Sequence, residues 1–244
     1  MRYPKMILFD YGHTLLYEPG YDTLNGEKAL FPYIRRNPNN VTPEQADALA
    51  GELFREMSQV RERDLEFQEQ TLLRYKCAYL EISYTVPPEE AELILWNGLS
   101  EGALMPGTAQ MLKYLSEAGI RSGVVSNLSF SGRTLTERIK TFLPQQQFSF
   151  ILTSSDCGFR KPHPRIFSLA LQKAGLPPED IWFCGDNTRA DIEGAAQAGM
   201  FPVWYDNATG REDKDVPMRV PGCDHLHIHA WSELTDILEN MKTG

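Results

Sequence analysis

Short apolar segments that each end at a polar residue are the feature that most constrains the fold of this chain. Met6–Phe9 runs directly into Asp10, and residues 181–184 are followed by Gly185 and Asp186. An uninterrupted apolar run of this length is typical of a strand that is buried on both faces. Similar runs predict further strands at residues 123–125, 148–152 and 201–205.

The segments between these runs have the apolar spacing of helices. They span residues 109–118, 135–142, 164–174 and 190–198. Strands that alternate with helices over short connections predict an α/β fold with a doubly wound parallel sheet. Polar residues at the carboxyl ends of such strands converge on one crevice. We therefore expect four of them to face one another: Asp10, Ser126, Asp156 and Asp186.

Residues 17–105 interrupt this alternation with a helical pattern. Thr42-Pro-Glu-Gln45 has the sequence of a capping box with proline at the first helical position, and it precedes a long amphipathic stretch. The charged run at residues 61–70 is typical of a solvated helix face. We predict a helical insert at 17–105 in a core made of residues 1–16 and 106–244.

The composition limits the partners and the location of the protein. The 244 residues contain 24 Lys and Arg against 33 Asp and Glu, a formal net charge of −9, so we expect no nucleic-acid partner. No run approaches the roughly 18 apolar residues of a membrane span, and the apolar start leads into Asp10 without a cleavage region. The four cysteines include no C-x-x-C pair, which is typical of reduced thiols. These features predict a cytoplasmic protein without a membrane partner, as a monomer or homodimer.

Four motifs at or near the predicted strand ends carry residues suited to phosphoryl chemistry. They are Asp10-Tyr-Gly-His-Thr14, Ser126-Asn127, Lys161-Pro162 and Gly185-Asp-Asn-Thr-Arg-Ala-Asp191. A carboxylate at a strand end can attack phosphorus and form an acyl phosphate. Paired carboxylates suit Mg²⁺, which prefers oxygen ligands. Hydroxyl, amide and ammonium groups can stabilise the charge of a phosphoryl group.

The four motifs, in this order, resemble those of the haloacid dehalogenase superfamily of aspartate-nucleophile hydrolases. The resemblance implies a Rossmann-like core, a C1-type helical cap at residues 17–105, and hydrolysis of a small phosphorylated metabolite with Mg²⁺. Asp10 would be the nucleophile and Lys161 would hold the anionic centre. Thr14, Ser126 and Asn127 would support the nucleophile loop and bind the phosphoryl group. The implied metal site comprises Asp10, the Gly12 carbonyl, Asp186 and Asp191, with Asp191 ligating through water or positioning Lys161.

Position 12 departs from the family pattern. Phosphatases of this family have a second Asp two residues after the nucleophile, which protonates the leaving group, whereas this chain has Gly12 followed by His13. General acid–base catalysis is worth about 10²–10⁴-fold in rate, so the loss is substantial. One alternative is that His13 or a cap residue supplies the proton.

Two further alternatives follow from the glycine at position 12. The substrate could need no acid, as in phosphonoacetaldehyde hydrolases, which cleave a C–P bond with the help of a cap lysine. The predicted cap contains only Lys28 and Lys76, neither in a recognisable motif. The other alternative is a catalytically weak regulatory protein that binds Mg²⁺ and a phosphorylated ligand.

The C-terminal part of the chain contains a loop-like stretch and a histidine-rich segment. Residues 206–222 have the composition of a surface loop. His225, His227 and His229 alternate, so they would share one face of a strand, as ligands of a transition metal could. No second His or Cys cluster in the sequence offers partners, which favours a structural role as the last strand.

Overall fold

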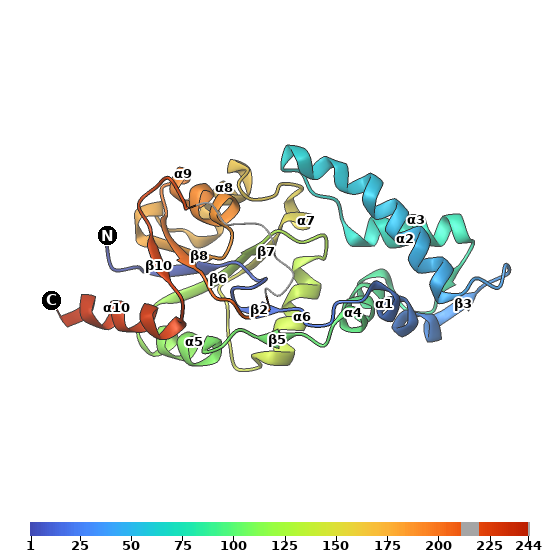
Figure 1. Ribbon diagram of the computed structural model, residues 1–244, viewed down its shortest axis with the longest axis horizontal. Helices are drawn as coiled ribbons and strands as arrows, with labels where there is room; N and C mark the ends of the chain where they lie inside the picture. The colour runs from blue at the N-terminus through green and yellow to red at the C-terminus, as the bar shows by residue number, and fades with distance from the viewer. Residues whose placement is uncertain (211–219, 244) are drawn as a thin grey trace.

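The core of the protein is a six-stranded parallel sheet with strand order β10-β9-β8-β1-β6-β7 (Figure 1). The computed structural model describes residues 1–210 and 220–243. The predicted doubly wound parallel sheet is confirmed, and β1 lies between β6 and β8. The strands are β1 (Met6–Phe9), β6 (Arg121–Ser126), β7 (Ile151–Thr153), β8 (Ile181–Gly185), β9 (Phe201–Tyr205) and β10 (Leu226–Ile228).

Helices cover both faces of this sheet (Figure 1). They are α5 (Thr108–Glu117), α6 (Gly132–Phe142), α7 (Ser154–Cys157), α8 (Pro164–Ala174), α9 (Gly194–Gln197) and α10 (Trp231–Thr243). In β1, Ile7 and Phe9 pack with the apolar side chains of α5 and α10, while Met6 and Leu8 pack with those of α8. All four β1 residues are fully buried, which explains why this strand is an uninterrupted apolar run.

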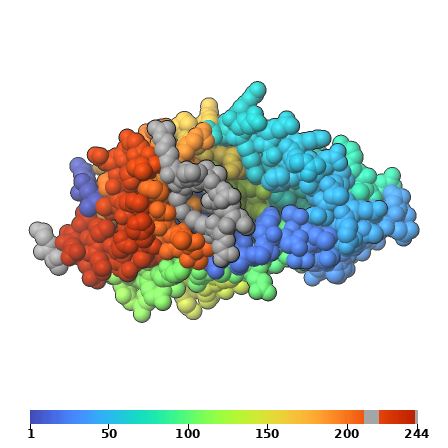
Figure 2. Space-filling view, viewed as in Figure 1, coloured from blue at the N-terminus to red at the C-terminus, as the bar shows by residue number. Residues whose placement is uncertain are grey.

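The helical insert projects from one end of the core (Figures 1 and 2). It contains α1 (Thr23–Leu30), η1 (Phe31–Tyr33), α2 (Pro43–Met57), η2 (Ser58–Arg63), α3 (Glu69–Leu80), α4 (Pro88–Leu99) and a two-stranded antiparallel sheet of β3 (Ile34–Arg36) and β4 (Ser83–Tyr84). The predicted capping box is confirmed, because Thr42 and Gln45 bond reciprocally at the start of α2. The chain enters and leaves the insert through β2 (Leu16–Tyr17) and β5 (Ala103–Leu104), which pair in antiparallel fashion.

Several element bounds differ from the sequence predictions. The edge strand β7 begins at Ile151 rather than at residue 148, because it pairs with β6 only along Ile151–Thr153. The helix predicted at 190–198 is divided into a π-helical turn, η4 (Thr188–Glu193), and α9. Residues 211–219 of the predicted loop at 206–222 lie outside the described residues. Across residues 1–210 and 220–243, no helix is long and apolar enough to cross a membrane.

Candidate active site

Asp10 lies at the carboxyl edge of the sheet, immediately after the central strand β1. Its N–H donates to the carbonyl of Cys184 at 2.9 Å, which continues the pairing of β1 with β8. The ammonium of Lys161, from the loop before α8, donates to Asp10 Oδ1 at 2.8 Å and to the carbonyl of Val125 at 2.7 Å. A carboxylate from one strand end and a lysine from a distant loop are therefore in direct contact, as the motifs predict.

Asp10, Asp186 and Asp191 form a cluster of carboxylates whose oxygens lie within 4.8 Å of one another. Asp191 Oδ1 is 2.7 Å from Lys161 Nζ, and Asp191 Oδ2 accepts a hydrogen bond from the Asn187 N–H at 2.9 Å. Three carboxyl groups gather beside one ammonium, and Asp186 and Asp191 are buried. A hard divalent cation such as Mg²⁺ fits this all-oxygen donor set.

The pKa values in this cluster reflect burial and mutual charge. The pKa of Asp191 lies above its ordinary value. Burial raises it most, Lys161 lowers it, and the carboxyl groups of Asp10 and Asp186 raise it further. Burial lowers the pKa of Lys161, but Asp10 and Asp191 raise it by more, so its pKa lies above the ordinary value. Lys161 is therefore a cation at neutral pH.

Gly185 makes room for Asp191. A Cβ atom built at position 185 would lie 2.4 Å from the Asp191 carboxylate, a distance that real Cβ contacts essentially never show. Asn187 accepts hydrogen bonds from the N–H groups of Arg189 and Ala190 and so starts the π-helical turn that carries Asp191 inward. The sequence motif included this glycine, but its packing role becomes evident only in three dimensions.

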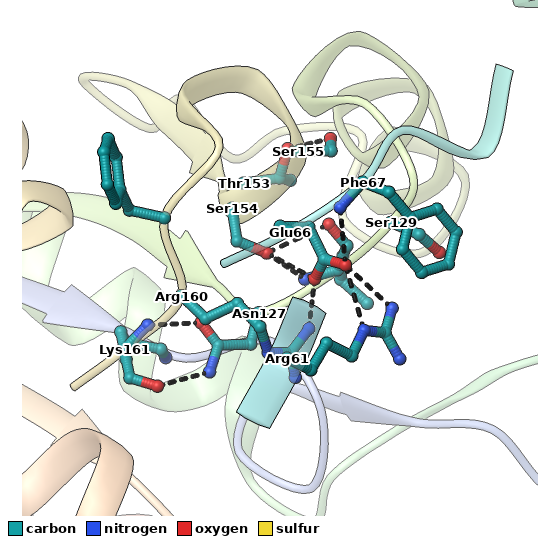
Figure 3. Close-up of polar contacts among 12 residues, drawn as sticks. Arg61, Glu66, Phe67, Asn127, Ser129, Thr153, Ser154, Ser155, Arg160 and Lys161 are labelled. Atoms are coloured by element: carbon teal, nitrogen blue, oxygen red, sulfur yellow. Dashed lines mark hydrogen bonds and ion pairs between the residues drawn. The ribbon is translucent and has the colours of Figure 1, made fainter. Parts of the chain in front are cut away.

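The predicted phosphoryl-binding residues have different environments in the structure. The side chain of Asn127 makes two hydrogen bonds with the peptide groups of Lys161, donating to its carbonyl at 2.9 Å and accepting from its N–H at 2.7 Å (Figure 3). Ser126 is buried at the end of β6. Thr14 is fully buried, and its hydroxyl has no hydrogen-bond partner among the described residues.

Asp156 does not join the acidic cluster, so its prediction at this crevice is wrong. It lies in α7 after the edge strand β7, and its exposed side chain accepts hydrogen bonds from the Gly132 N–H at 3.1 and 3.2 Å. The carboxylate therefore caps the start of α6. β7 is separated from β1 by β6, and the helical turn that follows it directs Asp156 toward α6.

A cavity of about 430 Å³ lies between the insert and the core, and Gly12 and Asn127 contribute to its wall. A Cβ atom built at Gly12 meets no described atom within 4 Å, so the position of the missing acid is open space. His13 has a left-handed backbone with φ of 54°, and its N–H donates to the carbonyl of Leu16. It is absent from the described residues that line the cavity, unlike Gly12.

Glu69, at the start of α3, is a buried carboxyl on the wall of the same cavity. Its Oε2 accepts a hydrogen bond from Ser129 Oγ at 2.8 Å, and its N–H donates to the Ser129 carbonyl. Burial raises the pKa of Glu69 to about 7, with Ser129 opposing the shift. Other charged or titratable groups that act on it or respond to it are Glu92, Lys76, Arg61 and Tyr21. The sequence analysis did not identify Glu69, which lay in a run predicted to be solvated.

The prediction of a solvated face at residues 61–70 is wrong, because this run contacts the core. The Glu66 carboxylate is fully buried, accepts hydrogen bonds from Arg61 at 3.0 Å and Ser154 at 2.9 Å, and pairs with Arg160 (Figure 3). Leu65 bridges to Phe159 in antiparallel fashion. This contact fastens the insert to the segment that precedes Lys161.

The two lysines of the insert do not face the cavity. Lys76 is fully buried and forms an ion pair with Glu27, whereas Lys28 is exposed on the last turn of α1. Neither belongs to the described residues that line the cavity. Their placement gives no support to the C–P hydrolase alternative, which requires a cap lysine at the substrate.

A family model described as haloacid dehalogenase-like hydrolase matches residues 89–204, a range that includes Ser126, Lys161, Asp186 and Asp191. The chain is 28% identical to a glyceraldehyde 3-phosphate phosphatase of Methanothermobacter thermautotrophicus over 96% of this chain and 99% of that one. It is 41% identical to a phosphoserine phosphatase of Thermus thermophilus over 69 residues, 28% of each chain.

Solved structures share the fold over nearly the full length. A 2-haloacid dehalogenase from Pseudomonas syringae pv. Tomato DC3000 covers 97% of this chain and 99% of its own, with a TM-score of 0.62 and 24% identity. The HAD-hydrolase YfnB from Bacillus subtilis, described as bound to magnesium, covers 98% and 99% with a TM-score of 0.56 and 22% identity. The family model, the curated relatives and the shared fold together support a haloacid dehalogenase-like hydrolase.

Proposed function

We propose that the protein hydrolyses a small phosphorylated metabolite, with Asp10 as the nucleophile. The observation that carries this proposal is the contact of Asp10 with Lys161 inside a cluster of carboxylates, beside a cavity large enough for a small metabolite. The names of the relatives, glyceraldehyde 3-phosphate phosphatase and phosphoserine phosphatase, support a phosphate monoester as the substrate class.

The cluster would hold Mg²⁺ through Asp10, Asp186 and Asp191, with the backbone carbonyl of Gly12 as a further ligand. When bound, Mg²⁺ would neutralise charge on the phosphoryl oxygens. Lys161 adds a fixed positive charge that contacts both Asp10 and Asp191. The side chain of Asn127 holds the main chain of Lys161 in place, and the Ser126 hydroxyl would donate a hydrogen bond to the phosphoryl group.

The reaction would have two steps. A carboxylate oxygen of Asp10 attacks phosphorus, the bond from phosphorus to the ester oxygen breaks, and the leaving alcohol takes a proton. A water molecule then attacks the aspartyl phosphate, which releases inorganic phosphate and restores Asp10. The first step needs a proton donor and the second needs a proton acceptor, and Gly12 can serve as neither.

Glu69 is the residue that we assign to this proton transfer. It lines the same cavity as Gly12, and its pKa of about 7 makes the protonated form available near neutral pH. Glu69 belongs to the insert, so the proton donor would be in place only while the insert covers the site. His13 is a weaker candidate, because Gly12 rather than His13 faces the cavity.

The insert at residues 17–105 would act as a C1-type cap that closes over the substrate and limits the access of water. The Glu66 contact with Arg160 and Ser154 would stabilise its closed position. A cytoplasmic location and a monomer or homodimer remain predictions from the sequence, as does the absence of nucleic-acid and membrane partners.

A panel of phosphate esters, assayed with Mg²⁺, tests the proposed function against the alternative of a regulatory binding protein. We expect Asp10→Asn to abolish turnover, because an amide oxygen is a poor nucleophile. Asp156→Asn is the matched control, since Asp156 also follows a strand of the sheet, the edge strand β7, but lies outside the cluster. The enzyme proposal fails if no ester is hydrolysed while Mg²⁺-dependent binding of a phosphorylated ligand persists.

A further inference from the structure

A second group of potential metal ligands lies on the edge strand of the sheet, where β10 follows β9 (Figure 1). One ligand atom each from Asp206, His227 and His229 lies within 4.8 Å of the other two. None of these residues belongs to the cluster around Asp10. The two histidines are exposed and Asp206 is half-buried, so an ion from solution can reach them.

The backbone register brings the three residues together. His227 pairs with Trp204 and Ile228 with Tyr205 in the β9–β10 ladder, and the Asp206 N–H donates to the Ile228 carbonyl at 2.8 Å. His227 and His229 are two residues apart on an extended chain, so their side chains share one face, with ring centroids 4.6 Å apart. Asp206 lies beside this pair because its N–H is bound to Ile228, the residue between the two histidines.

Contacts with neighbouring groups orient both imidazole rings. The His227 ring stacks on the Trp204 indole, with centroids 4.0 Å apart and an interplanar angle of 10°. His227 Nε2 lies 3.3 Å from Asp206 Oδ2. His229 Nδ1 lies 2.9 Å from the backbone carbonyl of Asp206, and because a carbonyl only accepts, this nitrogen carries the proton. The other nitrogen of His229 therefore has its lone pair available, in the arrangement that orients metal-binding histidines.

We propose that Asp206, His227 and His229 bind a transition-metal ion of the Zn²⁺ class. Two imidazole nitrogens and one carboxylate oxygen suit Zn²⁺, Co²⁺ or Ni²⁺, whereas Mg²⁺ prefers oxygen ligands alone. Ligands on one Zn²⁺ ion lie roughly 3.4 Å apart for bonds of about 2.1 Å, so small side-chain rotations close the observed separations. Three protein ligands leave a fourth position for water or for a ligand group.

The experiment is a Zn²⁺ titration of the full chain by calorimetry, after removal of metals and in an excess of Mg²⁺ to occupy the oxygen site. We expect one Zn²⁺ site in the wild type. His227→Ala and His229→Ala should each weaken it by roughly 100-fold or more, since loss of an outer-shell partner alone costs about 10–100-fold. His225→Ala is the matched control, because His225 is on the same strand face but its Nδ1 bonds to the Cys223 carbonyl, outside the cluster.

Zn²⁺ binding that is unchanged in the double variant His227→Ala/His229→Ala would overturn the proposal, as would an equal loss in His225→Ala. NMR spectroscopy of the wild-type protein tests the same site without a variant. In the wild type, Zn²⁺ should shift the imidazole NMR signals of two histidines among the five of the chain. Shifts that spare both His227 and His229 would contradict the site. Because these readouts are independent of turnover, they are unaffected if the proposed hydrolase activity fails.

Discussion

The side chain of Asn127 and the peptide groups of Lys161 are joined by two hydrogen bonds, of 2.9 Å and 2.7 Å. The Lys161 ammonium in turn contacts Asp10 and Asp191. A residue at the end of β6 thus controls the position of the cation at the end of β1. Asn127 acts here as a positioning residue for Lys161, a role that its sequence motif did not indicate.

Asn127→Ala should lower kcat by roughly 100-fold, because a displacement of about 1 Å in a catalytic group can have that effect. Asn37→Ala is a matched control: Asn37 makes the same reciprocal pair with the peptide groups of Val41, at 2.9 and 2.8 Å, in the insert. Steady-state kinetics of both variants separate a positioning effect from a general loss of structure. Equal losses of kcat in the two variants would contradict the assignment.

Gly185→Ala should destabilise the fold and displace Asp191, because the new methyl group would overlap the carboxylate at 2.4 Å. Overpacking of this kind costs about 1–3 kcal/mol in the free energy of unfolding. Gly12→Ala is the matched control, with no described atom within 4 Å of its Cβ, and should change that free energy by about 0.5 kcal/mol or less. Denaturant unfolding of both variants checks the difference, and similar losses would refute the packing role of Gly185.

Glu66→Ala should weaken the contact between the insert and the core. The change leaves the partly buried Arg160 and Arg61 without their shared carboxylate, and breaking a buried ion pair costs about 3–5 kcal/mol. Glu137→Ala, which removes an exposed pair with Lys140, should cost less than about 1 kcal/mol. Hydrogen exchange should show faster exchange at residues 64–66 and 158–160 in Glu66→Ala alone. Unchanged protection there would exclude the contact as a determinant of cap closure.

Glu69→Gln should lower kcat/KM by about 10²–10⁴-fold and remove an alkaline limb of the pH profile near pH 7. Glu69 must be protonated to donate, so wild-type activity should fall as the pH rises above about 7. Glu137→Gln is the control, because this exposed carboxyl lies outside the cavity wall and is not among the groups that shift the pKa of Glu69. An unchanged profile in Glu69→Gln would rule out this residue as the proton donor.

The same pKa predicts a stability effect. Because the pKa of folded Glu69 lies above its ordinary value of 4.5, the protonated form stabilises the fold at low pH. This contribution is lost as the pH rises through about 7, so the unfolding temperature of Glu69→Gln should exceed that of the wild type more at pH 8 than at pH 5. A difference independent of pH would contradict the raised pKa.

Gly12→Asp should restore activity to the Glu69→Gln variant. A Cβ atom at position 12 meets no described atom within 4 Å, and Gly12 lines the cavity, so a side chain here would point into open space. A gain of about 10²-fold or more in kcat/KM over Glu69→Gln would show that proton transfer is what both residues can supply. Gly12→Asn, which fills the same space without an acid, should give no rescue, and equal rescue by both would refute the interpretation.

The central strands were predictable because burial leaves a strong signal in sequence. β1 coincides with its apolar run, and Asp10 follows it directly. Edge strand β7 was less clear, since it pairs on one side only and its first predicted residues remain outside the ladder. The contact of Asp10 with Lys161 could be expected from motif order, although 151 residues separate them.

The role of residues 61–70 could not be read from local sequence. Charged residues on a helix are usually solvated, and only the approach of Arg160 and Ser154, about 90 residues away, converts Glu66 into a buried anchor. The same holds for Glu69, whose environment depends on Ser129 of the core. Likewise, Asp156 has the sequence context of a site residue, and its use as a helix cap depends on the position of Gly132.

The ribbon of β2 and β5 has a consequence for how such a protein can diversify. Leu16 pairs with Leu104 and Tyr17 with Ala103, so the chain leaves the core and returns to it at adjacent points. The geometry of the sheet therefore does not restrict the length of the insert between β2 and β5. Substitutions, insertions and deletions in the insert can reshape the cavity and exchange its proton donor while the ends of β1, β6 and β8 stay unchanged. Recognition and proton supply can thus evolve independently of the nucleophile.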